Sequence, residues 1–206
     1  MKIHEYGNKK SDIILLQPVG EHELAGLEGE LSQIGELTGR DFGWIGFQVE
    51  NWNRELSPWE AAAVFGKDDF GDGARDTLHE ILKYCNNPCK TYYLGGYSLA
   101  GLFSLWAAYQ TDIFEGIAAV SPSVWYPGFG EYMTGHELKC DRIYLSLGNK
   151  EEKTRNSVMR TVGDRIREAY AGFKEKNIAC ILEWNQGNHF REPELRMAKG
   201  FAWLMK

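Results

Sequence analysis

The chain has 206 residues, of which 43% are hydrophobic and 25% charged, and its formal net charge is -6 at pH 7. This length suits one domain, residues 1–206, with a full hydrophobic core, and the chain has no basic stripe that would attract nucleic acid. No run approaches the roughly 18 apolar residues that cross a bilayer, and the N-terminal residues lack the apolar centre of a secretory signal. We therefore expect a cytoplasmic protein without membrane or nucleic-acid partners.

The four cysteines are dispersed along the chain. Cys85 and Cys89 are the only close pair, and no histidine lies beside them. Structural zinc sites require four ligands, which come at paired spacings. We expect free thiols, no metal and no organic cofactor.

Apolar runs and their glycine and proline boundaries predict about six buried strands, at residues 12–17, 43–49, 91–96, 116–120, 142–147 and 178–184. Helical periodicity predicts helices at residues 23–37 and 73–84, from the end of the third strand to residue 108, past Gly148 to about residue 176, and from residue 193 onwards. The fourth of these has an apolar face that includes Val158, and a long aromatic loop spans residues 50–71. Uniformly apolar strands that alternate with helices predict a mostly parallel sheet in a three-layer α/β/α sandwich.

The segment from Tyr92 to Gly101 carries the strongest functional signal. An apolar strand runs into Ser98, and a helix-forming apolar stretch follows directly. Gly96 and Ala100, two residues before and after the serine, keep bulky side chains away from a sharp turn. Gly-x-Ser-x-Ala is common by chance, but a strand before it and a helix after it are typical of a nucleophile elbow.

A base and an acid for this serine follow later strands. Active sites of open parallel sheets lie beyond the carboxyl ends of the strands, where Glu151, Glu152 and His189 all fall. The order serine, acid, histidine is that of α/β-hydrolases. We expect His189 as base and Glu151 as acid; Glu152 is the alternative acid, and His22 is the main rival base because its loop should border the site.

An acyl-transfer site also needs two N–H donors for the oxyanion. The first is expected to be Leu99, directly after the nucleophile, and the second Val19, because Pro18 beside it has no N–H. Trp52 and Trp125 lie in loops after strand ends and are the candidate substrate contacts. An ester with an apolar acyl or aromatic part would suit them.

Three segments together, Gly95 to Gly101, Ser121 to Trp125 and Gly187 to Phe190, resemble the putative esterase group of the α/β-hydrolase superfamily, which includes esterase D and the enterochelin esterases. The resemblance runs from about Asp12 to the end of the chain and implies an α/β-hydrolase fold with serine esterase chemistry. Members usually have more strands before the first one predicted here, which implies a sheet trimmed at the N-terminus. Many also have aspartate where this chain has glutamate.

The predicted function is a serine hydrolase that cleaves a small carboxylic ester through an acyl-serine intermediate. A large anionic siderophore is not the expected substrate, because no cluster of Arg or Lys is visible to receive it. Two alternatives remain open. A thioesterase or acyltransferase would use the same triad, whereas a catalytically silent binding module would use only the fold.

Overall fold

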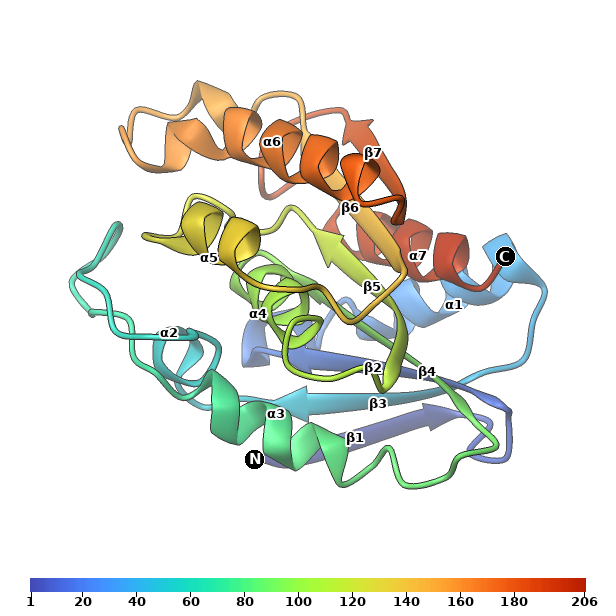
Figure 1. Cartoon of the computed structure of the whole chain (residues 1–206). Helices are drawn as coiled ribbons and strands as arrows, with labels where there is room; N and C mark the ends of the chain where they lie inside the picture. Colours follow the sequence, from blue (N-terminus) through green and yellow to red (C-terminus); the bar gives the residue numbers. More distant parts are fainter.

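A computed structural model describes residues 1–206, and Figure 1 shows a central sheet with helices on both faces. The strands are β1 (Lys2–Gly7), β2 (Ile13–Val19), β3 (Gly43–Gln48), β4 (Thr91–Tyr97), β5 (Phe114–Val120), β6 (Arg142–Gly148) and β7 (Ala179–Asn185). The α-helices are α1 (Leu27–Thr38), α2 (Trp52–Glu55), α3 (Ala74–Leu82), α4 (Leu99–Ala107), α5 (Phe129–Gly135), α6 (Val162–Glu175) and α7 (Pro193–Leu204). Short 3-10 turns are η1 (Glu21–Glu23), η2 (Glu151–Lys153) and η3 (Met159–Thr161). The α/β sandwich predicted from the sequence is confirmed.

The sheet is mostly parallel, as expected. Its spatial order is β1-β3-β2-β4-β5-β6-β7, and every neighbouring pair is parallel except β1 with β3. Parallel neighbours require crossover connections, which the helices supply on both faces. The carboxyl ends of β4, β6 and β7 therefore lie at the same edge of the sheet, which is where the site forms.

The strand β1 was not predicted, because the first apolar run begins at residue 12. Its sequence, KIHEYG, is largely exposed at the sheet edge and holds no apolar run. A strand with one neighbour and little burial carries a weak hydrophobic signal. The sheet thus has one strand more before Ile13 than the sequence indicated.

Two apolar clusters cover the two faces of the sheet. The larger one lies beneath α3, α4, α5 and α6 and includes Phe103 of the fully buried helix α4. The smaller one lies beneath α1 and α7 and includes Ile34 and Phe201. All seven residues of β2 are buried between these layers, which explains why that strand reads as a continuous apolar run.

The loops differ more from the prediction than the strands do. Residues 150–161 form η2, a loop and η3, so that α6 begins only at Val162 and Val158 is exposed. The helix α5 was not predicted, and the aromatic loop after β3 contains the short helix α2 and a bridge between Ala61 and Phe70. These segments pack by aromatic contacts without a regular period, and period was the signal used to predict elements.

All four cysteines are unpaired. The helices are also too short or too polar for any of them to span a lipid bilayer.

Candidate active site

Ser98 stands on a strained turn between β4 and α4. Its backbone has φ 58° and ψ -119°, a conformation that L-residues rarely adopt and that costs on the order of 1–3 kcal/mol. The turn is held in place because the Ser98 N–H donates to the carbonyl of Val120 at 3.0 Å. In a strand-to-helix turn with this backbone conformation, the serine side chain is exposed beyond the carboxyl end of the strand.

The small residues around Ser98 are needed for space. A Cβ on Gly96 would collide with the carbonyl of Ala100, and one on Gly101 would lie 2.9 Å from the carbonyl oxygen of Gly96. Strand and helix therefore approach each other too closely for larger side chains. This is the physical reason for the Gly-x-Ser-x-Ala pattern seen in the sequence.

His189 lies against Ser98. Its Nε2 is 3.0 Å from the Ser98 Oγ, and its Nδ1 is 2.7 Å from the Oε2 of Glu151. The hydroxyl of Tyr97 donates to the backbone carbonyl of His189 at 2.6 Å and so fixes the loop after β7. The structure therefore brings together Ser98, Glu151 and His189, which lie 53 and 38 residues apart in chain order.

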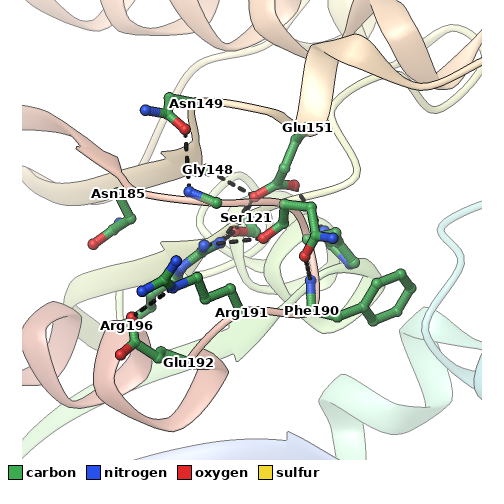
Figure 2. Close-up of polar contacts among 12 residues, drawn as sticks. Ser121, Gly148, Asn149, Glu151, Asn185, Phe190, Arg191, Glu192 and Arg196 are labelled. Atoms are coloured by element: carbon green, nitrogen blue, oxygen red, sulfur yellow. Dashed lines mark hydrogen bonds and ion pairs between the residues drawn. The ribbon is translucent and has the colours of Figure 1, made fainter.

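Glu151 is buried at the start of η2, directly after β6. Its Oε1 accepts hydrogen bonds from the N–H of Gly148 at 2.7 Å and from the hydroxyl of Ser121 at 2.8 Å (Figure 2). Desolvation by burial, the largest single influence, raises the pKa of Glu151. The hydrogen bond and charge of His189, with the donors Gly148 and Ser121, outweigh it and bring the pKa below its usual value of 4.5.

The alternatives from the sequence take other places. Glu152 pairs with Arg167 at 3.1 Å on a partly exposed surface. His22 lies edge-on to Trp52, with ring centroids 5.3 Å apart, and is not hydrogen-bonded to Ser98. Glu151 and His189 are thus the acid and imidazole that meet at the serine.

Arg196 is a component of this site that the sequence did not indicate. It lies on α7 with 1% of its surface exposed, and its Nη1 is 3.0 Å from the Oε1 of Glu151. Figure 2 shows its guanidinium pointing to the same carboxylate as Ser121. An arginine within the buried face of the terminal helix was the available signal, because a charge there requires a buried partner.

The expected second oxyanion donor, Val19, is the last residue of β2 and lies within its parallel pairing with β3. Val19 pairs with Gln48 and its carbonyl accepts from the N–H of Val49, a register in which the Val19 N–H is directed at β3. The next amide, of Gly20, donates to the carboxylate of Glu23 at 2.8 Å. In η1 the N–H of Glu23 donates to the carbonyl of Gly20 at 3.1 Å, which leaves the N–H groups of Glu21 and His22, together with that of Leu99 at the start of α4, without a partner inside their helices.

The three aromatic residues near the site differ in exposure. Trp125, a predicted substrate contact, is 8% exposed and packs against Phe65 and Phe70. Trp52 is half-buried beside Gly20 and stays a candidate contact. Phe190, which was not predicted, is 85% exposed and lies edge-on to the His189 ring. Its exposure is not a property that sequence pattern reveals.

Together the sheet order, the strained serine turn and the carboxyl-edge position of Ser98, His189 and Glu151 define an α/β-hydrolase fold. No family model matches the chain. Among curated proteins, the uncharacterized protein YbbA of Bacillus subtilis (strain 168) is 27% identical over 180 residues, which cover 78% of this chain and 72% of that protein.

Similar solved structures share the fold at low sequence identity. An IroE-like serine hydrolase from Shewanella oneidensis has a TM-score of 0.75 and 15% identity, and the match covers 98% of this chain and 75% of that one. The siderophore hydrolase EstA from Aspergillus nidulans has a TM-score of 0.69 and 17% identity, with 97% and 84% covered. The enterobactin esterase FES from Shigella flexneri has a TM-score of 0.68 and 12% identity, with 98% and 54% covered.

Proposed function

We propose that this chain is a serine hydrolase that cleaves a small carboxylic ester. The observation that carries the proposal is the unbroken hydrogen-bonded series from Ser98 through His189 to Glu151, with 3.0 Å and 2.7 Å between the heavy atoms. The similar folds of a serine hydrolase, a siderophore hydrolase and an enterobactin esterase support the same chemistry.

In the first half-reaction the Ser98 Oγ attacks the ester carbonyl carbon while the Nε2 of His189 takes the hydroxyl proton. The donors that we propose for the resulting oxyanion are the N–H of Leu99 at the start of α4 and the N–H groups of Glu21 and His22 at the start of η1. The intermediate then collapses, and His189 gives its proton to the departing alcohol. The acyl group remains on Ser98.

In the second half-reaction a water molecule attacks the acyl carbon and gives its proton to His189. Collapse releases the carboxylic acid and returns the proton to the Ser98 Oγ. Glu151 accepts the Nδ1–H of His189, which fixes the tautomer with a free Nε2 and stabilises the imidazolium. Its lowered pKa keeps it an anion at neutral pH, as this role requires.

The substrate we propose carries an apolar group near the ester. The aromatic side chains that we propose to contact this group are Phe190, which lies edge-on to the His189 ring, and Trp52 beside Gly20. Burial of apolar substrate surface against them would contribute about 25 cal/mol per Å². No metal or organic cofactor takes part in this scheme.

The test is hydrolysis of a series of p-nitrophenyl esters, together with labelling by a fluorophosphonate, with Ser98→Ala as the matched control. The proposal predicts turnover and labelling that both disappear in the control. Turnover that survives Ser98→Ala would contradict the triad. Absence of both signals in the parent protein would favour a silent binding module, and preference for thioesters or for acyl transfer would redefine the leaving group or acceptor.

A further inference from the structure

The carboxylate of Glu151 contacts both a histidine and an arginine. The Oε2 of Glu151 faces the Nδ1 of His189, whereas the Oε1 faces the Nη1 of Arg196 at 3.0 Å. Side-chain exposure is 2% for Arg196 and 5% for Glu151, so solvent does not screen this ion pair. A buried guanidinium beside a proposed catalytic acid affects both the orientation and the charge of that acid.

The other nitrogen of the same guanidinium reaches the loop that carries the histidine. The Nη2 of Arg196 donates to the carbonyl of Gln186 at 3.2 Å and to that of Asn188 at 3.0 Å. Both carbonyls lie within three residues of His189. One planar group therefore connects the acid after β6 with the loop after β7.

The remaining contacts of Arg196 also belong to the site. Its Nη1 lies 3.2 Å from the hydroxyl of Tyr97 and 3.2 Å from that of Ser121. Burial, the main influence, raises the pKa of Tyr97 to about 12, so this phenol stays neutral. The titratable or charged groups facing Glu151 are thus His189, Arg196 and a neutral Tyr97, from the loop after β7, from α7 and from β4.

We propose that Arg196 is a positioning residue that acts through Glu151: it fixes the carboxylate beside the histidine and moderates the negative charge that the histidine experiences. The proposal rests on the proposed serine hydrolase function. A lysine at this position would keep the charge but cannot reproduce the planar fork that reaches the carboxylate and two carbonyls together. A methionine would keep the bulk of the side chain but remove both the charge and the planar fork.

The two substitutions therefore separate charge from geometry. In Arg196→Met the whole charge of Glu151 acts on the imidazolium, so the acid limb of the kcat/KM profile moves to higher pH by about half a unit or more. We expect kcat to fall about 10- to 100-fold with KM within about threefold, since the change affects orientation and not substrate binding. In Arg196→Lys the acid limb stays in place and kcat falls less.

The matched control is Arg191→Met, in the same segment. Arg191 is exposed and pairs with Glu192 at 3.4 Å, so the same loss of charge occurs where solvent screens it. We expect its pH profile and kcat to match those of the parent. All rates are divided by the folded fraction from circular dichroism, so that a loss of stability alone does not register as a loss of kcat.

Arg196→Met leaves Glu151 buried without its cation and can unfold, so the same change is also made in Glu151→Gln, which gives a double variant without either buried charge. If Arg196 acts through Glu151, most of the loss caused by Arg196→Met disappears in this background. Equal losses in both backgrounds would overturn the proposal. So would a folded Arg196→Met protein whose pH profile matches that of the parent.

A measurement without substrate separates this proposal from the proposed function. The ring resonances of His189 are titrated by NMR in the parent and in the Arg196 and Arg191 variants. A midpoint that rises in Arg196→Met alone supports the proposal even if no ester is hydrolysed, and an unchanged midpoint contradicts it. Absence of hydrolysis and labelling in the parent would contradict the serine hydrolase function alone.

Discussion

Glu151 and Arg196 form an ion pair with 3.0 Å between Oε1 and Nη1 and with both side chains almost fully buried. The second oxygen of the same carboxylate accepts from His189 at 2.7 Å. The acid of the site is thus positioned from two sides, by its histidine and by a helix at the end of the chain. Substitutions at the serine, at the acid and in the residues around them should therefore have distinct and measurable effects.

Replacing either partner of the 3.0 Å contact between Ser98 and His189 should remove nearly all activity. We expect Ser98→Ala and His189→Ala each to lower kcat by about 10⁴-fold or more, because attack and proton transfer depend on both. The measurement is ester hydrolysis under saturating substrate. The double variant should be hardly worse than either single one, and additive losses would show that the two residues do not act as a unit.

Glu151 and Glu152 give a sharp contrast between neighbours. Glu151→Gln should lower kcat by about 10²–10⁴-fold because the amide neither stabilises the imidazolium nor enforces its tautomer. Glu152→Gln removes only an exposed pair with Arg167 and should change kcat less than about twofold. The two variants are compared in the same assay, and a larger loss in Glu152→Gln would reverse the assignment of the acid.

Gly148 has no room for a side chain. A Cβ there would lie 2.9 Å from the Oε1 of Glu151 and 3.0 Å from the Nη2 of Arg196. Gly148→Ala should therefore displace the carboxylate, lower kcat and destabilise the fold by about 1–3 kcal/mol. The control is Gly135→Ala, at a position with no heavy atom within 4 Å of the added Cβ. Thermal unfolding and ester hydrolysis measure both effects.

Glu23 makes folding stability depend on pH. Burial, the largest influence, and the charge of Glu194 raise the pKa of Glu23 from 4.5 to about 7 in the folded state, although its bond from Gly20 lowers it. The folded state then binds a proton more tightly than the unfolded state does. The stability from this proton is complete below pH 4.5 and is lost as pH rises to about 7.

Glu23→Gln should remove this loss, because the amide stays neutral and its oxygen can still accept from Gly20. We expect the variant to be about 1–3 kcal/mol more stable than the parent at about pH 8, with little difference at about pH 4. Urea unfolding at several pH values measures this. Burial also raises the pKa of Glu30, so a reduced slope should persist in the variant. A parent and a variant with parallel curves would contradict the prediction.

Truncation of Trp125 should lower the stability of the fold, whereas truncation of Phe190 should change substrate binding. Trp125 is buried among aromatic rings, so Trp125→Ala should cost about 3–5 kcal/mol of stability. Phe190 is exposed, so Phe190→Ala should leave the unfolding temperature nearly unchanged and raise KM for esters with bulky apolar groups. Differential scanning fluorimetry and steady-state kinetics give the two readouts. A stability loss in Phe190→Ala would show that it packs within the protein.

Much of the arrangement could be predicted because the relevant signals are local. The central strands are buried on both faces and therefore read as apolar runs, and Ser98 lies in a pattern of small residues that the strained turn requires. The chain order placed Glu151 and His189 after later strands of the same sheet. The edge strand β1 gave no comparable signal, since it is mostly exposed.

Two other expectations involved features that are not local. Val19 has an N–H that its pairing with β3 directs at that strand, and Trp125 follows a strand but packs against Phe65 of a distant loop. Both residues were chosen for their position relative to a strand. The direction of an N–H group and the coverage of a side chain depend on the packing of segments far apart in the sequence.

The sequence by itself determined the parallel α/β sheet, the serine turn and the set of residues from which an acid and a base would come, because strand burial and turn strain restrict which residues fit. Only the tertiary structure decided that Glu151 rather than Glu152 meets His189, and that Arg196 is buried against the same carboxylate. The physical reason is that these contacts join the ends of different strands to the last helix. Neighbouring residues of one turn also face different surroundings, so the carboxylate of Glu151 is buried whereas that of Glu152 is partly exposed.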